Sequence, residues 1–447
     1  MHPVIIVGNG IAGITTARHL RKHSERSIIV ISDEADHFFS RTALMYVYMG
    51  HMTKEHLKPY PDSFWKKNRI DLINDRVEAI HPETKAVHLR SGKQLQYSDL
   101  VIATGSKPIR PQLPGIELEG IHSLYFMSDL DKLELESNPP ASIHPNQKKK
   151  AVITGGGLIG IELAEMLMYR NYDVTLLIRD RHYWSSVFPP EEANLVAEHL
   201  TEHGLNIVYG VSVEAFEGKD GRVTAARGSN GESYPCELAG VTIGVAPNID
   251  WMDGVVETKR GILTDEFLRT SRNHIYAAGD CVELRNPLSG RRAIEPVWYV
   301  GRMMGECLGL TLSGRETAYR PGKWFNSAKF FDLEYQTYGN VPADSDRAMS
   351  FYFVHPHKRA CLRLAFNAER TLTGIHSIGI RLRHVVIDDW LNKQVPVETA
   401  VVRMREANFE PEFEHPFEDH LVEAWNAAFK QSLTLKRRSW LQKLTSK

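Results

Sequence analysis

Short apolar runs alternate with segments of helical periodicity in the first part of the chain. Val4–Val7 predicts a buried strand, residues 11–23 predict a helix, and Ile28–Ile31 predicts a second strand. The same order of strand, helix and strand is predicted again at Ala151–Thr154, Leu158–Arg170 and Val174–Ile178. Parallel strands joined by a helix form a βαβ unit, so the pattern predicts two similar α/β domains.

The C-terminal part of the chain has a different pattern. Longer strands are predicted at Phe325–Tyr338, Ala348–Phe353 and Cys361–Phe366, and helices at His384–Leu391 and Val397–Asn408. We therefore expect a third domain of the α+β class. Residues 136–150, rich in Pro, Asn and Lys, predict a linker before the second α/β unit.

The length and net charge of the chain limit its number of domains and its class of function. The 447 residues allow about three domains. The 54 basic and 55 acidic residues give a net charge of -1, so the basic footprint of a nucleic-acid-binding protein is missing. No signal-peptide pattern begins the chain, and no apolar run reaches the ~20 residues that span a bilayer. The simplest interpretation is a cytoplasmic protein.

A glycine fingerprint lies at both strand–helix junctions. In such a turn the first glycine permits a tight bend, the second lets the backbone approach a pyrophosphate, and the third allows the helix to pack closely on the sheet. The residues concerned are Gly8, Gly10, Ile11, Ala12 and Gly13 in the first turn and Gly155, Gly157, Leu158, Ile159 and Gly160 in the second. We expect two bound dinucleotides.

An acidic pair follows the second strand. Asp33 and Glu34 lie about 20 residues beyond the first glycine turn, where a carboxylate that binds ribose belongs. We favour Glu34 as the ribose ligand. The alternative is that both are solvated loop residues.

Three further segments occur in a fixed order. They are Val101-Ile102-Ala103-Thr104-Gly105, then Thr242-Ile243-Gly244-Val245-Ala246-Pro247-Asn248, then Ile275-Tyr276-Ala277-Ala278-Gly279-Asp280. With the two glycine turns they resemble the pyridine nucleotide-disulfide oxidoreductase superfamily over about residues 1–320. The resemblance implies that Ala103, Thr104, Gly105, Gly244 and Gly279 line the cofactor sites and that Asp280 hydrogen-bonds the ribityl chain of FAD.

The resemblance also implies a fold. We expect an α/β protein with two Rossmann-like dinucleotide-binding domains in a glutathione-reductase-like layout, plus a C-terminal α+β domain. Residues 1–112 and 240–320 would form the FAD-binding domain and 113–239 the NAD(P)-binding domain. Residues 321–447 would form the C-terminal interface domain with its basic tail.

The cysteines exclude the disulfide-using branches. Cys236, Cys281, Cys307 and Cys361 are scattered, with no C-x-x-C pair and no zinc-ligand spacing, and we expect no metal site. Those branches place C-x4-C where this chain has the segment 40–46, Ser-Arg-Thr-Ala-Leu-Met-Tyr. A redox disulfide needs two sulfurs within bonding distance. Electrons are therefore expected to leave the flavin directly.

Residues 31–41 and 324–339 resemble motifs of ferredoxin and rubredoxin reductases. In these enzymes an arginine approaches the FAD, which implies this role for Arg41. A family lysine that pairs with a glutamate beside the flavin is replaced here by Tyr46. Glu162 matches the glutamate, and we take both as catalytic candidates. The alternative is that Glu162 only shapes the nicotinamide pocket.

A wall beside the flavin ring is expected from Glu295, Pro296 and Trp298, with Trp298 as a third catalytic candidate. The alternative is that Trp298 is a core aromatic residue.

The coenzyme preference is indicated by the end of the second strand of the second unit. NADH enzymes usually carry an acidic residue there, but this chain has Ile178 followed by Arg179-Asp180-Arg181. Arg179 and Arg181 resemble arginines of glutathione reductase that meet the 2′-phosphate of NADPH. We therefore favour NADPH over NADH. In the alternative, Asp180 shifts by one residue and binds NADH.

The tail from Lys430 onward is basic. Aromatic and leucine residues share a helical stripe there, namely Trp425, Phe429, Leu433, Trp440 and Leu444. This pattern allows membrane contact through an interfacial helix. The ordinary alternative, which we favour, is that the stripe packs on its own domain.

Three functions fit these features. The first, which we favour, is an FAD-dependent NAD(P)H oxidoreductase that passes electrons directly to a ferredoxin- or rubredoxin-like protein carrier. The second is a membrane-peripheral NAD(P)H:quinone reductase. The third is a nicotinamide-sensing flavoprotein with a non-enzymatic partner role, in which NAD(P)H binding shifts homodimer formation or partner choice, as the layout shared with apoptosis-inducing factor allows.

Overall fold

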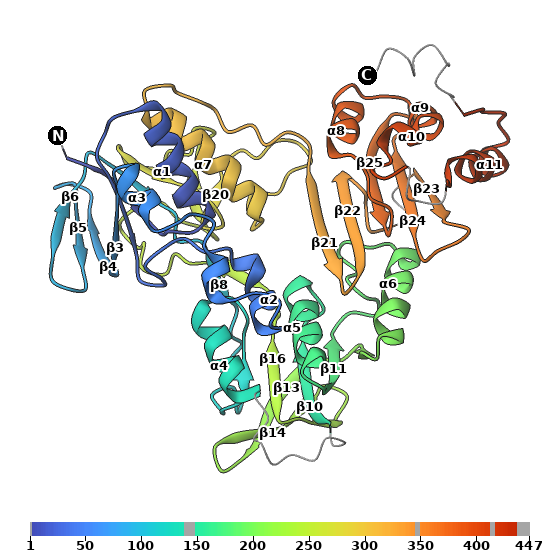
Figure 1. Ribbon diagram of the computed structural model, residues 1–447, viewed down its shortest axis with the longest axis horizontal. Coiled ribbons are helices and arrows are strands. Elements are labelled where there is room, and N and C mark those ends of the chain that lie inside the picture. The colour runs from blue at the N-terminus through green and yellow to red at the C-terminus, as the bar shows by residue number, and fades with distance from the viewer. Residues whose placement is uncertain (1, 138–147, 345–348, 412–415, 436–447) are drawn as a thin grey trace. The chain divides into compact units, whose positions relative to one another are not determined.

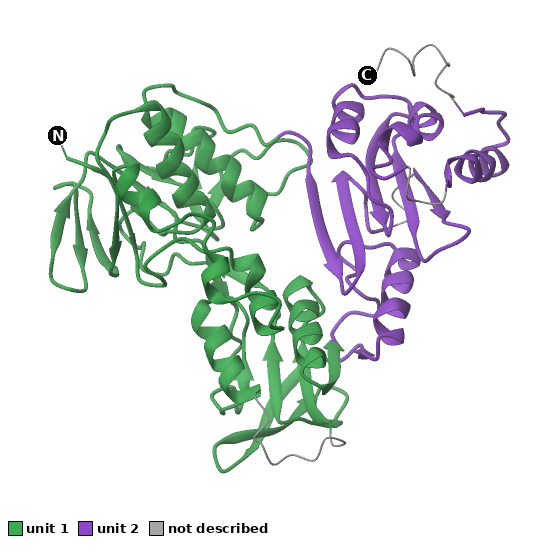
Figure 2. Cartoon of the chain, viewed as in Figure 1, with its two compact units in different colours: residues 1–177, 212–321 green, residues 178–211, 322–447 purple. Residues whose placement is uncertain are grey.

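The computed structural model describes residues 2–137, 148–344, 349–411 and 416–435 (Figure 1). The chain divides into two compact units (Figure 2). Unit 1 comprises residues 1–177 and 212–321, and unit 2 comprises residues 178–211 and 322–447. Unit 2 thus adds residues 178–211 to the C-terminal segment, whereas the sequence places them in the NAD(P)-binding domain. The three-domain division stays a prediction.

The first sheet of unit 1 is parallel and has the strand order β19-β7-β1-β2-β3. Its strands are β1 (Val4–Val7), β2 (Ile28–Ser32), β3 (Ile70–Asn74), β7 (Asp99–Ile102) and β19 (Ile275–Ala277). Helix α1 (Ile11–His23) connects β1 to β2. The strand–helix–strand unit predicted at the N-terminus is therefore confirmed. Because β1 is buried throughout, it is a continuous apolar run rather than an alternating one, and β7 is apolar after the buried Asp99.

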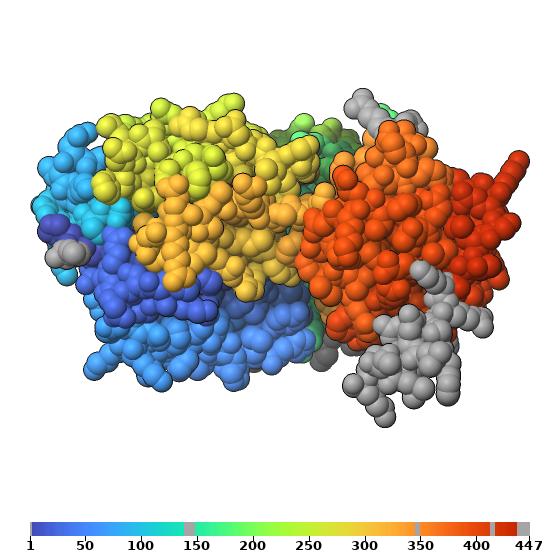
Figure 3. Space-filling view, turned by 90° about the horizontal axis from the view of Figure 1, so that it is seen from above, coloured from blue at the N-terminus to red at the C-terminus, as the bar shows by residue number. Residues whose placement is uncertain are grey.

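A distant helix, α7 (Trp298–Leu312), packs closely on α1. Gly301, Gly305 and Gly309 recur at every fourth position and face α1; a Cβ added at Gly305 would lie 2.6 Å from the carbonyl oxygen of Ala12. Small residues at this spacing let two helices approach closely. The space-filling view shows N-terminal residues (blue) beside residues near 300 (yellow to orange) (Figure 3).

A second parallel sheet contains the strands β11-β10-β16-β9 in that order. Their bounds are β9 (Ile121–His122), β10 (Lys149–Thr154), β11 (Tyr172–Ile178) and β16 (Leu238–Val241). Helix α5 (Leu158–Tyr169) connects β10 to β11, so the second predicted βαβ unit is confirmed as well. The remaining elements of unit 1 that matter below are α2 (Leu44–Tyr48), α4 (Met127–Ser137), β8 (Ser106–Pro108) and β17 (Val245–Pro247).

Unit 2 contains an antiparallel sheet of order β21-β22-β25-β24-β23. Its strands are β21 (Phe325–Phe330), β22 (Leu333–Gly339), β23 (Met349–Val354), β24 (Cys361–Phe366) and β25 (Leu372–Ile378). Its helices are α6 (Pro190–Glu202), α8 (His384–Asn392), α9 (Val397–Val402), α10 (Met404–Ala407) and α11 (Glu418–Phe429).

Two element predictions in this unit are wrong. The single strand predicted over Phe325–Tyr338 is a hairpin, because the chain turns at Phe331, which has a φ of 59°. The single helix predicted over Val397–Asn408 is two short helices that break at Arg403.

The described part of the predicted aromatic stripe packs inside unit 2. Trp425 is fully buried, and Phe429 and Leu433 pack against the same core. The ordinary alternative thus holds for these three residues. Trp440, Leu444 and the basic residues from Lys436 onward lie outside the described residues. Within the described part of the chain, no helix combines the length and apolar character that a membrane crossing requires.

Candidate functional site

The two glycine turns of unit 1 repeat one geometry. Gly8 has a φ of 108° and Gly155 a φ of 106°, a region that side-chain-bearing residues rarely adopt. A Cβ added at Gly8 would lie 2.2 Å from the carbonyl oxygen of Ala103, and one added at Gly155 would lie 2.4 Å from that of Thr242. Only glycine fits at either position, because the backbone of a neighbouring strand occupies the space of a side chain.

The middle glycines are open, in contrast. Gly10 and Gly157 are the N-cap residues of α1 and α5, and a Cβ added at either would meet nothing within 4 Å. Cβ atoms added at Gly13 and Gly160 would lie 2.0 and 2.1 Å from the carbonyl oxygen of the first glycine in each turn. Each turn therefore leaves a bare, accessible helix N-terminus, which favours a phosphate group.

Glu34 and Arg41 form a bidentate ion pair. Arg41 Nη1 donates to Glu34 Oε1 at 2.9 Å, and Nη2 donates to Oε2 at 2.6 Å. Their side chains are only 18% and 30% exposed, respectively. Asp33, by contrast, is 52% exposed and lies 3.9 Å from Arg76. Of the two predicted acidic residues, the inward one is Glu34.

A polar network links Arg41 to Asp280. Arg41 donates to the carbonyl oxygen of Tyr125, and its guanidinium lies 4.5 Å from the centroid of the Tyr125 ring. The Ser106 hydroxyl lies 2.8 Å from the Tyr125 hydroxyl and donates to Asp280 Oδ2 at 2.8 Å. Burial raises the pKa of the Asp280 carboxyl, while Ser106 and Arg41 act in the opposite direction.

Ser106 and Tyr125 were missed by the sequence-based assignment. The usable signal for Ser106 is its position, directly after the Ala103-Thr104-Gly105 segment. No local signal marks Tyr125, which precedes α4.

Other residues of the predicted cofactor-binding segments also make contacts within unit 1. Gly279 has a φ of 86°, and a Cβ there would lie 2.9 Å from the Ala12 side chain. Thr104 Oγ1 donates to the carbonyl oxygen of Asn248 at 2.9 Å, and β8 pairs with β17. Gly244, with a φ of 121°, lies just before β17. The predicted segments around residues 104 and 244 are thus joined to each other, and the segment around residue 279 contacts the start of α1.

Glu162 lies on α5 in the second glycine-turn unit. Burial raises the pKa of its carboxyl to about 7, and the nearby Glu165 adds to the rise. Tyr46 lies on α2, is 36% exposed, and its ring lies 6.2 Å from that of His51. Among the described residues, no hydrogen bond joins Tyr46 to Glu162.

Trp298 begins α7 and is 37% exposed, so it is not a core aromatic residue. Glu295 is engaged in an ion pair with Arg291, whose Nη2 lies 2.5 Å from Glu295 Oε2, and both side chains are 5% exposed.

Arg179 and Arg181 directly follow β11, and both are exposed. The side chain of Arg179 is 84% exposed, and its Nε lies 3.5 Å from Asp180 Oδ1. Asp180 in turn accepts a hydrogen bond from the Ser185 hydroxyl at 2.8 Å. Arg179 and Arg181 thus place two exposed guanidinium groups just after the end of β11.

All four cysteines are buried and unpaired with one another. Burial raises the pKa of Cys236 and Cys361 to about 12 and that of Cys281 and Cys307 to about 11. A thiol reacts as its thiolate, so none of these groups is suited to redox chemistry near neutral pH.

Residues 2–305 match the family model of the pyridine nucleotide-disulphide oxidoreductases. The chain belongs to this family. It is an FAD-dependent NAD(P)H oxidoreductase with Rossmann-like domains, as the motifs predict.

Known proteins resemble this oxidoreductase over most of its length. The probable ferredoxin reductase CtmF of Castellaniella defragrans is 32% identical over 360 residues, which cover 77% of this chain and 83% of the relative. The rubredoxin-NAD(+) reductase of Acinetobacter baylyi is 30% identical over 329 residues, covering 71% and 80%. The structure of an NAD-dependent persulfide reductase from A. fulgidus has a TM-score of 0.83 at 25% identity and covers 95% of this chain and 83% of that one.

Proposed function

We propose that this oxidoreductase uses NAD(P)H to reduce a small ferredoxin- or rubredoxin-like protein, without a thiol relay. The observation that carries the proposal is the state of its cysteines: all four are buried with raised pKa values, and the segment 40–46 contains none. The names of the two curated relatives support a protein carrier as the acceptor.

The first glycine turn fits the pyrophosphate of FAD. Gly10 leaves the N-terminus of α1 open, where a phosphate group is stabilised by the backbone N–H groups and the helix dipole. Asp280 would accept hydrogen bonds from the ribityl chain, and Glu34, oriented by Arg41, would accept them from the ribose. When bound, FAD supplies two-electron chemistry with the nicotinamide. The chain's own residues only hold it and exclude water.

The second glycine turn fits the pyrophosphate of the nicotinamide coenzyme in the same way, at Gly157 and the N-terminus of α5. The carboxyl of Glu162, with a pKa of about 7, would hold or release a proton near this turn at neutral pH. Arg179 and Arg181 favour NADPH, because their exposed guanidinium groups suit a 2′-phosphate and β11 does not end in an acidic residue.

Anaerobic reduction of the purified yellow protein tests the proposal. NADH and NADPH are mixed with the oxidised protein in separate stopped-flow experiments, and flavin reduction is followed by absorbance. Oxidised ferredoxin, rubredoxin, a quinone, a persulfide of coenzyme A and oxygen are then offered in turn. We expect the fastest reoxidation with one of the two protein carriers, and faster reduction by NADPH than by NADH.

The variant Arg179→Ala tests the coenzyme preference. It should weaken NADPH binding by roughly tenfold or more, because it removes a charge-assisted hydrogen bond of about 1.5–3 kcal/mol. NADH binding should be nearly unaffected. Preferential reoxidation by the persulfide would refute the protein-carrier proposal. Equal effects on both coenzymes would refute the role of Arg179.

A further inference from the structure

We infer that unit 2 carries a binding site for a divalent transition metal ion of the zinc class, formed by His199, His203 and Asp332. His199 Nε2 lies 2.9 Å from Asp332 Oδ1, and His203 Nε2 lies 3.4 Å from the same oxygen. One ligand atom from each of the three residues lies within 4.8 Å of the others. Tetrahedral metal ligands at bond lengths near 2.0–2.1 Å lie about 3.3 Å apart, so these separations suit a shared ion.

The fold brings the three side chains together from two elements. His199 lies in the last turn of α6 and His203 is its C-cap residue, so their spacing of four places both rings on one face. The ring centroids are 4.4 Å apart. Asp332 lies in the turn between β21 and β22, directly after Phe331 with its positive φ, and the Phe331 ring packs 5.5 Å from the His203 ring.

The hydrogen bonds of His203 leave its outer nitrogen available as a ligand. His203 Nδ1 lies 2.8 Å from the carbonyl oxygen of His199, and this contact requires the proton to be on Nδ1. In the neutral imidazole, Nε2 then presents a lone pair towards Asp332. A ligating histidine characteristically donates its other N–H to a backbone carbonyl or a carboxylate in this way.

His199 provides a second, independent observation. Its side chain is only 8% exposed, and its Nε2 contacts Asp332 Oδ1 at 2.9 Å without the angle of a regular hydrogen bond. A buried imidazole nitrogen without a hydrogen bond normally costs free energy. An ion between the two atoms would satisfy both.

The charge and exposure of the cluster are appropriate for a dication. Two neutral imidazoles and one carboxylate carry a single negative charge, a ligand set that zinc and its neighbours accept. Arg359, whose charge acts on His199, is paired with Glu202 on α6 and is thereby largely neutralised. Asp332 is 74% exposed and His203 40% exposed, so an ion has an entry path and room for a water ligand.

The site belongs to unit 2, whereas the glycine turns belong to unit 1, and the inference does not depend on the proposed function. A bound ion would link α6, from residues 178–211, to the β21–β22 hairpin, from residues 322–447, within unit 2. The sequence predicts no metal site on the basis of its cysteines. The unused signal was the His-x3-His spacing of His199 and His203, in a segment where no helix was predicted.

Zinc retention tests the inference. The full-length flavoprotein is stripped with a chelator, dialysed against buffered zinc chloride, and analysed for zinc by mass spectrometry. We expect the wild type to retain one zinc ion per chain more than the variants His203→Gln and Asp332→Asn. Their zinc affinity at this site should fall at least about tenfold, since loss of an outer partner alone costs 10–100-fold.

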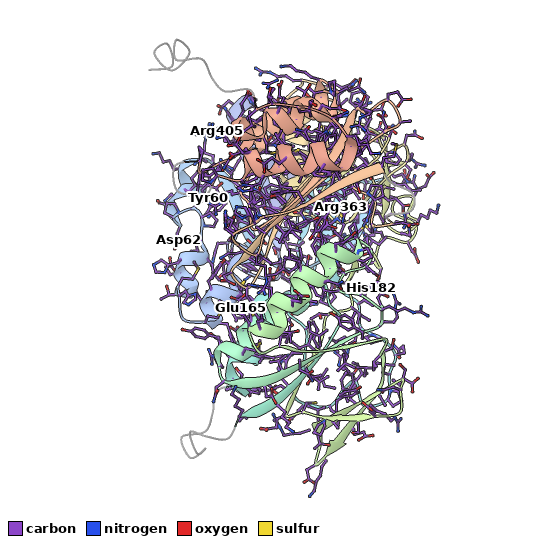
Figure 4. All side chains as sticks on the ribbon, turned by 90° about the vertical axis from the view of Figure 1, so that its right-hand side faces the viewer. Tyr60, Asp62, Glu165, His182, Arg363 and Arg405 are labelled. Carbon is purple, nitrogen blue, oxygen red and sulfur yellow. The ribbon has the colours of Figure 1, made fainter. Side chains whose placement is uncertain are left out.

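His182→Gln provides the matched control. His182 lies exposed on the same segment and is labelled in Figure 4. This variant should retain the wild-type amount of zinc, and zinc should raise the melting temperature of the wild type and of His182→Gln but not of the two ligand variants. Equal zinc retention by all four proteins, with flavin content and circular dichroism unchanged, would overturn the inference and leave His199 and Asp332 as an ion pair.

Discussion

The Asp280 carboxyl lies next to Gly279, which contacts Ala12 of the first glycine turn. It accepts a hydrogen bond from Ser106, and its pKa is raised by burial. We expect Asp280→Ala to lower FAD affinity by roughly 10- to 150-fold, because a hydrogen bond to a charged group contributes about 1.5–3 kcal/mol. The ratio of flavin to protein absorbance after gel filtration measures the loss.

Asp33→Ala is the control for this residue. Asp33 belongs to the same predicted set but is half exposed and faces Arg76. The variant should retain its flavin. Full flavin retention by Asp280→Ala would contradict the assignment of Asp280, and flavin loss from both variants would point to a general loss of stability.

Residues could be predicted where the signal is local. The glycines of both turns and Asp280 belong to short segments whose backbone requirements are visible in the sequence. Contacts between distant residues could not be predicted in this way: Ser106 and Asp280 are 174 positions apart. Side-chain pairing was also missed at short range: Arg41 was placed near FAD, but its ion pair with Glu34, seven positions away, was not foreseen.

At the scale of elements, the open second turn leads to a clear prediction. Gly157 has an ordinary φ of -77° and no neighbour within 4 Å of an added Cβ, so Gly157→Val should fold normally. The new side chain would occupy the approach to the N-terminus of α5. We expect reduction by NAD(P)H to slow by at least about 100-fold, which needs only about 2.7 kcal/mol of steric cost. Reduction by dithionite should be unchanged.

Gly155→Val is the contrasting variant in the same turn. Its positive φ and the carbonyl oxygen 2.4 Å from the added Cβ predict poor folding rather than a selective loss of reduction. If Gly157→Val were reduced by NADPH at the wild-type rate, the second turn would not be the nicotinamide site.

Elements with strong periodicity were predicted almost to the residue, as α1 and β24 illustrate. The hairpin at Phe331 was missed because no Gly, Pro or Asn-Gly marks the turn. Phe330 and Phe331 are both buried there, so the apolar run continues through the bend. The break at Arg403 was missed for a related reason, since no Gly or Pro marks it.

At the scale of the whole molecule, unit 2 combines two segments that are far apart in the sequence. Residues 178–211 follow β11 directly, so the order of elements places them with the nicotinamide unit. Their association with residues 322–447 depends on contacts over about 170 positions, which periodicity does not reveal. One of these contacts is an ion pair between α6 and β24.

Arg363 of β24, labelled in Figure 4, lies at the centre of this contact. Its Nε donates to both carboxylate oxygens of Glu192 at 3.0 Å, its Nη2 to Glu191 at 2.9 Å, and its Nη1 to Ser350 at 3.0 Å. His376 Nδ1 lies 3.3 Å from Glu192 Oε1. Glu192 is fully buried and Arg363 is 4% exposed. The pair is therefore almost entirely removed from water.

Breaking this pair on one side should be far more harmful than removing it entirely. Arg363→Ala leaves the Glu192 carboxylate buried without its cation, which costs about 3–5 kcal/mol, whereas the double variant Arg363→Met with Glu192→Met should recover most of the loss. Arg381→Ala, which breaks the partly exposed pair with Glu334, should cost less than about 1 kcal/mol. Urea unfolding followed by tryptophan fluorescence measures all three. Similar stabilities for Arg363→Ala and Arg381→Ala would mean that the Arg363–Glu192 pair does not hold the two segments of unit 2 together.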